Sequence, residues 1–357
     1  MLTVLSVAYP LAPVRPDTAG GAEQVLSMLD SALADAGGMS IVIAAEGSRT
    51  AGVLVRIPPP ASIFDERARR ESQAAACRAI NEALGKWRID LVHMHGIDFD
   101  RYLPPAGVPV LATLHLPPAW YGPDALAPKR PGTYLVCVSE SQRRSCPCRA
   151  GSIRVVENGI PVGNYGRKFS KKGFALMLGR ICPEKGVHLG MEAAREAGAP
   201  LAIAGTVFPY PEHLAYFRNS VQPGLDGTGC RFLGPVGGAG KSRLLGEAQC
   251  LLAPSLAPET SSLSAMEAMA SGTPVVAFPS GALPEIVDEG RTGFLVANTR
   301  EMAEAIRAAG SLDPDLCRET ARRRFSAERM TAEYFALYRR IARGELETED
   351  PRGGSER

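Results

Sequence analysis

The segment FALMLGRICPEKGVHLGMEAAREAGAPLAIAG, residues 174–205, decides the fold class. It begins with the apolar run FALMLGR (174–180), continues through a helical stretch and returns to a second apolar run, PLAIAG (200–205). A strand, a helix and a strand in this order form a parallel pair with the helix packed across the sheet. The same alternation extends along the chain in both directions, so the sequence predicts an α/β protein.

Two sets of short apolar runs follow this pattern. Their near-continuous Val, Ile and Leu content is typical of parallel strands that are buried on both faces. The predicted strands are residues 2–9, 40–45, 90–95, 108–115, 133–139 and 153–158 in the first set, and 174–180, 200–205, 230–236, 250–255, 273–279 and 293–297 in the second. Helical periodicity is clearest at 22–36, 66–84 and 327–342.

The length of 357 residues and a polar stretch after Pro161 indicate two domains. We expect one doubly wound, Rossmann-like domain over residues 1–165 and a second over 172–325, with ligands bound in a cleft at the carboxyl ends of their strands. The final helix, within 326–344, carries an aromatic stripe and is expected to cross back to the N-terminal domain. Residues 345–357 are charged and are predicted to be a disordered tail.

Composition excludes several classes of protein. Forty Lys and Arg against 38 Asp and Glu give a net charge of +2, which argues against a dedicated nucleic-acid binder. Eight cysteines in a chain of this length do not form a disulfide scaffold, and Cys182, which borders an apolar run, is predicted to be a buried thiol. His188 and His213 lie on helical stretches and are interpreted as surface or packing residues.

The location in the cell is predicted from the apolar runs. None approaches the roughly 18–20 residues that cross a bilayer, and MLTVLSVAYP at the N-terminus is interpreted as a strand rather than a signal peptide. We therefore expect a cytoplasmic protein. Residues 101–156 carry seven Lys and Arg against two Asp and Glu. A solvated surface is the favoured interpretation of this segment, and peripheral contact with an anionic membrane or a phosphorylated acceptor is the alternative.

Two glycines mark the first candidate ligand site. The sequence T-A-G-G-A-E (18–23) follows the first predicted strand and begins the first helix. Gly20 and Gly21 would let the backbone approach a ligand closely, and the free N–H groups of a helix start attract phosphate. An ordinary strand-to-helix turn is the alternative, since the glycine pattern of a dinucleotide-binding loop is absent.

Two cations mark the second candidate site. The sequence L-G-R-I-C-P-E-K-G (178–186) places Arg180 and Lys185 just beyond a predicted strand. The guanidinium fork of an arginine and the point charge of a lysine can together neutralise a diphosphate leaving group. Solvated surface charges are the alternative.

Two glutamates eight positions apart mark the third and most specific site. In A-P-E-T-S-S-L-S-A-M-E (257–267), a helix is expected to begin near Ser261 or Ser262, which leaves Glu259 in the preceding loop and Glu267 inside the helix. The amides at this helix start can receive a phosphate while Glu267 accepts hydrogen bonds from ribose hydroxyls. Simple charge complementarity at the helix start is the alternative.

In their order along the chain, these motifs resemble glycosyltransferase family 4. The resemblance spans about residues 1–340 and is most specific across 174–297; it rests on GGAE, DLVHMHG, TLH, VSES, ENGI, LGRICPEKG, FLGPV and the block from Glu259 through SGTPVVAFPSGALPEIVDEGRTGFLV. It implies the GT-B architecture of two Rossmann-like domains and retaining transfer from a nucleotide-diphosphate sugar, with a UDP- or GDP-linked donor. It implies no cofactor and no required metal, and it leaves a small molecule, a lipid-linked sugar or a glycan open as the acceptor.

The resemblance also implies roles for single residues. Arg180 and Lys185 would contact the diphosphate, Glu259 the hydroxyls of the transferred sugar, and Glu267 the ribose. The remaining predicted contacts are the amides near Ser262, Leu263 and Ser264 for phosphate, the turn around Gly234 and Val236 for the base, Gly20 and Gly21 for the diphosphate, His115 for the reacting centre, and His95 as a weaker candidate there.

One departure from the family pattern affects the donor site. Members commonly have Pro-Phe-Gly after the first glutamate, whereas this chain has Thr260-Ser261-Ser262. Ser262 therefore puts a side chain where the family brings a glycine backbone against the donor. The resemblance consequently leaves the preference for sugar and base open.

Other motifs suggest other functions. GGAGKS (237–242) looks like a phosphate loop, but Pro235 occupies the position of the required first glycine. Asp98–Asp100 and Asp313–Asp315 have the Asp-x-Asp spacing of metal-dependent transferases, although the second pair is predicted to lie in a turn between helices. A sugar-nucleotide epimerase or hydrolase of the same fold, and a non-catalytic sugar-nucleotide-binding protein, stay as alternatives to the transferase.

Overall fold

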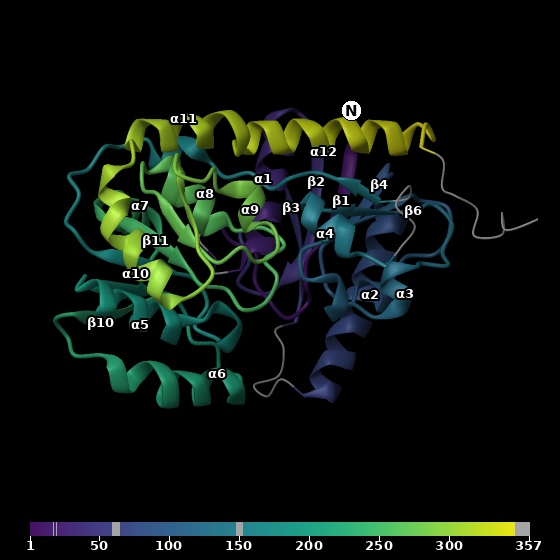
Figure 1. Cartoon of the computed structure of the whole chain (residues 1–357). Coiled ribbons are helices and arrows are strands. Elements are labelled where there is room, and N and C mark those ends of the chain that lie inside the picture. Colours follow the sequence, from purple (N-terminus) through teal and green to yellow (C-terminus); the bar gives the residue numbers. More distant parts are fainter. Residues whose placement is uncertain (17, 19, 59–64, 148–152, 347–357) are drawn as a thin grey trace, which may run out of the picture. The chain divides into compact units, whose positions relative to one another are not determined.

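The computed structural model describes residues 1–16, 18, 20–58, 65–147 and 153–346. The chain forms two compact units, labelled by element in Figure 1. The N-terminal unit contains residues 1–157 together with the chain from residue 330 onward, and the C-terminal unit contains residues 158–329.

The N-terminal unit is built on a parallel sheet of seven strands in the order β3-β2-β1-β4-β5-β6-β7. Strand β1 therefore lies between β2 and β4, and Leu5 pairs with Ile41 on one side and Val92 on the other. The strands are β1 (Thr3–Val7), β2 (Met39–Ala45), β3 (Val53–Ile57), β4 (Leu91–Met94), β5 (Val110–Leu114), β6 (Thr133–Cys137) and β7 (Ile153–Val155).

Helices cover both faces of this sheet. Its helices are α1 (Gly21–Asp35), α2 (Glu66–Lys86), α3 (Pro123–Leu126), α4 (Glu140–Ser145) and α12 (Ala327–Ala342), of which α12 joins the unit from Met330 onward. Alternate residues of β1 point to opposite faces, so Leu5 belongs to a core with Ile80 of α2, whereas Val4 belongs to a core with Val25 of α1 and Tyr334 of α12. Burial on both faces explains the continuous apolar runs of the sequence.

The C-terminal unit repeats this design with six parallel strands in the order β10-β9-β8-β11-β12-β13. The strands are β8 (Ala175–Leu178), β9 (Leu201–Ala204), β10 (Cys230–Gly234), β11 (Cys250–Ala253), β12 (Val275–Ala277) and β13 (Gly293–Leu295). The helices are α5 (Val187–Ala197), α6 (Pro211–Tyr216), α7 (Gly238–Glu247), α8 (Leu263–Ala270), α9 (Leu283–Ile286), α10 (Thr299–Ala308) and α11 (Pro314–Arg324). One face packs against α8 and α11, and the other against α5 and α10.

The predicted α/β class is confirmed, and every predicted apolar run contains a strand. Strand β3 is not predicted from the sequence, because this short edge strand leaves Val53 exposed and includes Arg56, so it lacks the apolar run of a central strand. The predicted disordered tail, residues 345–357, falls outside the described residues from 347 onward. Among the described helices, we find none that combines the length and the apolar character of a membrane span.

Candidate donor site

A pocket in the C-terminal unit brings together five of the predicted site residues. It lies where β8 and β11 end and α8 begins, and Arg180, Lys185, Glu259, Ser262 and Ser264 all line it. The carboxyl ends of parallel strands are the usual ligand-binding edge of such a sheet. A larger hollow of the same unit, lined by Arg167, Phe169 and Arg243 among others, contains none of the predicted residues.

Lys185 and Glu259 form an ion pair across this pocket. The Lys185 ammonium donates to Glu259 Oε1 at 2.5 Å, and the Ser255 hydroxyl donates to the same oxygen. The side chains of Lys185 and Glu259 are 29% and 11% exposed, so both stay within reach of a ligand in the pocket. The loop after β8 and the loop before α8 are thus linked by opposite charges.

Arg180 lies two residues beyond the end of β8, at the entrance to the loop that carries Lys185. Within the described part of the chain, its guanidinium makes no ion pair or side-chain hydrogen bond. A cation with no carboxylate partner at the edge of a pocket is well placed to receive an anion.

The loop after β8 needs its final glycine. Gly186 has φ +62° and is the N-cap of α5, and a Cβ at this position would lie 2.2 Å from the carbonyl oxygen of Pro254. No other residue fits this close approach without a shift of the backbone. Gly186 therefore fixes the turn that presents Lys185 to the pocket.

Ser262 is the N-cap of α8, which begins at Leu263, close to the predicted start. Its backbone is extended at φ −122°, its hydroxyl accepts from the Ala265 amide at 3.4 Å, and its side chain is buried. Any residue can adopt this extended conformation, so the position does not require glycine. The hydroxyl of Ser262 caps the start of the helix. Leu263 packs against the core beside α8, and Ser264 Oγ lies 3.3 Å from Ser262 Oγ.

Glu267 is held on the inner side of α8 by two donors. The ammonium of Lys241, on α7, and the hydroxyl of Tyr165 both reach Glu267 Oε1, at 2.6 and 2.7 Å. The Glu267 side chain is only 5% exposed, so this carboxylate needs these partners to stay buried. Neither donor is predicted from the sequence, although Lys241 lies in the GGAGKS segment.

Gly234 and Val236 are not among the residues that line this pocket. Gly234 ends the edge strand β10 with φ +70°, and its carbonyl accepts from the Gly205 amide at 2.8 Å. Val236 packs against the core beside α8. Their predicted role beside the base stays a prediction.

In the N-terminal unit, Gly20 and Gly21 form the start of α1. Gly20 is the N-cap, and the carboxylate of Glu23 folds back over it, since a Cβ on Gly20 would lie 1.8 Å from Glu23 Oε2. Glu23 is buried. The helix start therefore already has a carboxylate beside it, and an incoming phosphate would have to displace this group.

The two predicted histidines lie side by side at the ends of β4 and β5. His95 Nδ1 and His115 Nε2 are 3.0 Å apart and share a hydrogen bond, and the rings are stacked. Burial lowers the pKa of His115 to about 3. Burial, followed by the neighbouring His93 and His115, lowers the pKa of His95 well below its usual range. Both imidazoles are therefore neutral at neutral pH.

His93 joins these histidines to α12. Its Nδ1 lies 2.7 Å from the Tyr338 hydroxyl and its Nε2 lies 2.7 Å from Thr113 Oγ1, which in turn contacts the Tyr334 hydroxyl at 3.0 Å. Among the described residues, His95 Nε2 is buried without a hydrogen-bond partner. The aromatic stripe of α12 thus supplies polar partners as well as apolar packing.

The two Asp-x-Asp pairs have structural roles. The Asp98 carboxylate accepts hydrogen bonds from the side-chain amide of Gln73 at 2.7 Å and from the Tyr102 hydroxyl at 3.1 Å. Asp313 is the N-cap of α11 and accepts from the Asp315 amide at 2.8 Å. These contacts hold Asp98 and Asp313 to neighbouring groups of the fold.

Two family models match the chain. The model described as Glycosyltransferase Family 4 matches residues 19–163, and the model described as Glycosyl transferases group 1 matches residues 173–310. The two matches are separated by residues 164–172, which belong to the segment that connects the two sheets.

Curated relatives match part of the chain. A D-inositol 3-phosphate glycosyltransferase from Nocardioides is 36% identical over 206 residues, which are 48% of this chain and 42% of that protein. A phosphatidyl-myo-inositol mannosyltransferase from Mycobacterium leprae is 37% identical over 89 residues, which are 25% of this chain and 24% of that protein. The chain thus matches less than half the length of these relatives.

Solved structures match nearly the whole chain. AviGT4, a glycosyltransferase involved in avilamycin A biosynthesis, has a TM-score of 0.72 at 24% identity over 96% of this chain and 99% of its own. Sucrose-phosphate synthase from Thermosynechococcus elongatus has a TM-score of 0.79 at 20% identity over 96% and 100%. HepE from Anabaena, in complex with UDP and glucose, has a TM-score of 0.73 at 18% identity over 94% and 99%.

These likenesses establish the fold, and the family models cover both units in the expected order. The chain belongs to glycosyltransferase family 4 and has the GT-B fold.

Proposed function

We propose that this protein transfers a sugar from a nucleotide-diphosphate sugar to an acceptor with retention of the anomeric configuration. The observation that carries the proposal is the pocket that gathers Arg180, Lys185, Glu259 and the capped start of α8. Two cations and a helix start concentrate positive potential in one place although the net charge of the chain is only +2.

The ion pair in the pocket suggests how the donor binds. A diphosphate attracts Lys185 more strongly than a single carboxylate does, so we expect the ammonium to turn from Glu259 toward the phosphates. Glu259 then has a free oxygen that can accept hydrogen bonds from the hydroxyls of the sugar. Arg180 supplies a second cation with two parallel N–H donors.

The transfer step needs electrostatic help from these groups. The bond from the anomeric carbon to the phosphate oxygen breaks, the acceptor oxygen bonds to the same face, and the leaving phosphate takes the proton of the acceptor. Negative charge accumulates on the diphosphate, where Arg180 and Lys185 stabilise it. We propose that His115 acts as a neutral hydrogen-bonding group at the reacting centre, since its lowered pKa excludes a cation at neutral pH.

The base, the sugar and the acceptor are chosen for testing from the relatives. HepE was solved with UDP and with UDP-glucose, so UDP-linked sugars come first and GDP-linked sugars second. The curated relatives are named for inositol phosphate and phosphatidylinositol acceptors, so inositol phosphates lead the acceptor panel.

The test is acceptor-dependent release of nucleotide diphosphate, with the product configuration read by NMR. We expect turnover without added Mg²⁺ or Mn²⁺ and the same anomeric configuration in donor and product. Donor consumption without an acceptor would indicate the epimerase or hydrolase instead. Tight nucleotide binding with no turnover on the whole panel would indicate the non-catalytic protein.

A further inference from the structure

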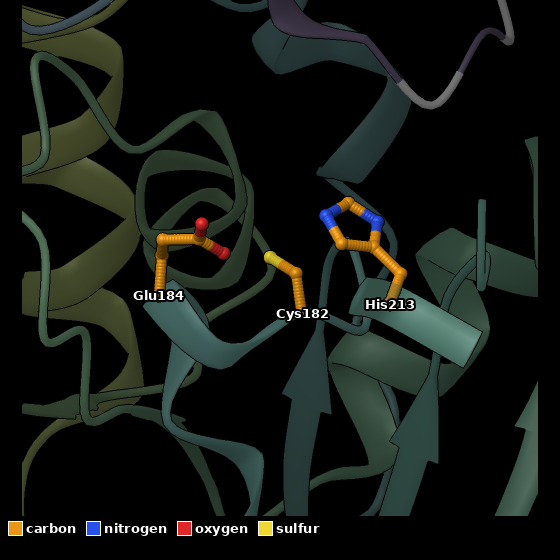
Figure 2. A group of neighbouring side chains, drawn as sticks. All are labelled: Cys182, Glu184 and His213. Atoms are coloured by element: carbon orange, nitrogen blue, oxygen red, sulfur yellow. The ribbon is translucent and has the colours of Figure 1, made fainter. Parts of the chain in front are cut away.

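Three side chains of different chemistry meet beside the donor pocket. The Cys182 thiol, the Glu184 carboxylate and the His213 imidazole each offer one atom, and these atoms lie within 4.8 Å of one another. Figure 2 shows the sulfur between the carboxylate and the ring. Cys182 and Glu184 belong to the loop after β8, and His213 belongs to α6.

The polar atoms of this cluster are buried and incompletely satisfied. Cys182 is 0% exposed and His213 is 8% exposed. The thiol of Cys182 donates a weak hydrogen bond to the backbone carbonyl of Arg180 at 3.9 Å. Among the described residues, Glu184 Oε2 and His213 Nδ1 are nevertheless buried without a hydrogen-bond partner. Such atoms cost free energy in a folded protein and call for a ligand or a partner.

The chemistry of the three ligating atoms determines which metal ion they can bind. Thiolate, imidazole and carboxylate together are typical of zinc sites, whereas magnesium and calcium prefer oxygen ligands alone. Zinc bond lengths place tetrahedral ligands roughly 3.3–3.6 Å apart, so small side-chain rotations are enough to close this cluster around an ion. Burial lowers the pKa of His213, which keeps the imidazole neutral and available to a metal.

We propose that Cys182, Glu184 and His213 bind one Zn²⁺ per chain, with water as the fourth ligand. Burial raises the pKa of Cys182 to about 11, so the thiol is protonated in the metal-free protein. Binding forms a zinc–sulfur bond and releases the thiol proton to solvent. The zinc ion, the thiolate, the carboxylate and the neutral imidazole then have a net charge of zero. Without the ion, the cluster carries the single negative charge of Glu184.

The site has a consequence for the neighbouring pocket. Cys182 and Glu184 lie between Arg180 and Lys185 in the same loop, and the ion would fasten this loop to α6. The local negative charge beside the two cations is removed at the same time. Zinc is therefore expected to strengthen donor binding without contacting the reacting atoms. The metal site does not depend on the proposed transfer, because zinc binding is measured without any donor.

The experiment titrates the metal-free full-length protein, without a histidine tag, with Co²⁺ and then Zn²⁺. We expect one equivalent of Co²⁺ to produce a thiolate charge-transfer band, and Zn²⁺ to remove it. Cys182→Ser should abolish the band, and His213→Gln should weaken binding at least about tenfold. The matched controls are Cys230→Ser on β10 and His188→Gln on α5, which should bind as the wild type does.

Two results would overturn the zinc site. One is a wild-type protein that binds neither metal, which would leave the cluster as a buried thiol beside a carboxylate and a packed histidine. The other is undiminished binding by both Cys182→Ser and His213→Gln. Circular dichroism checks that the variants fold, and His213→Gln keeps the test valid if Cys182→Ser does not. Added Zn²⁺ should also raise the Tm of the wild type and of both controls but not of the two ligand variants.

Discussion

Lys185 is the residue on which the proposed chemistry depends most. Lys185→Ala removes a cation from the position where charge develops on the leaving diphosphate, so turnover should fall roughly 10²–10³-fold. Steady-state kinetics on the identified donor and acceptor measures this change. Lys172→Ala is the matched control, because the Lys172 side chain is 54% exposed and forms an ion pair with Glu247 in the same unit. Near-normal turnover of Lys185→Ala with an unchanged Tm would refute the diphosphate role.

Lys241 is expected to stabilise the fold rather than to act in the reaction. Lys241→Met leaves the buried Glu267 carboxylate with Tyr165 as its remaining side-chain donor among the described residues, and the free energy of unfolding should fall by about 2 kcal/mol. Urea denaturation measures it. The double variant with Glu267→Gln should recover part of the loss, since the uncompensated charge is gone. Strictly additive losses would show that the two side chains do not interact.

At the scale of elements, α8 depends on its N-cap. Ser262→Ala removes the oxygen that accepts from the Ala265 amide and should lower the free energy of unfolding by about 1 kcal/mol, whereas Ser262→Gly should cost only a few tenths of a kcal/mol. Ser262→Gly also restores the residue common in the family, so it separates a capping role from a steric one. Equal stability of Ser262→Ala and the wild type would exclude the cap.

The ends of β4 and β5 predict how stability responds to acid. His93, His95 and His115 have folded-state pKa values below the ordinary 6.5, chiefly because of burial. Below pH 6.5 the unfolded chain therefore binds protons at these three histidines, whereas the folded chain keeps them neutral. The free energy of unfolding is therefore highest above this pH. It falls as the pH is lowered further, by about 1.4 kcal/mol per pH unit for each histidine.

Urea denaturation between pH 7 and pH 5 tests this dependence. The wild type should lose stability steeply below pH 6.5, and His115→Gln should lose it less steeply because one proton-binding site of the unfolded chain is removed. His188→Gln, on α5 in the other unit, serves as the control and should follow the wild type. A flat profile for the wild type would contradict the buried, neutral state of these histidines.

At the scale of the whole molecule, most of the fold could be predicted from the sequence. Parallel strands buried on both faces produce apolar runs that stand out, and α12 was predicted with the bounds that the structure has. The edge strand β3 was not predicted, because its first four residues are exposed or half-buried and one of them is Arg56. A continuous apolar run forms only where both faces of a strand are buried, so a half-exposed edge strand has none.

The candidate site was predictable only where neighbouring residues in the sequence carry its chemistry. The five pocket residues come from two short motifs, and each motif ends or begins an element at the same edge of the sheet. The partners of Glu267 are Tyr165 and Lys241, which lie 102 and 26 positions away and have no motif of their own. The same holds for His213, which reaches Cys182 and Glu184 only through the fold.

The proposed transfer requires the pocket of the C-terminal unit to bind a nucleotide diphosphate. Isothermal titration calorimetry of residues 1–357 with UDP, GDP and their sugar conjugates measures this binding. We expect binding of one base, weakened about tenfold or more in Arg180→Ala and unchanged in Arg195→Ala, which removes an exposed arginine of α5. Absence of binding to every nucleotide, or equal binding by the wild type and Arg180→Ala, would refute a nucleotide diphosphate site in this pocket.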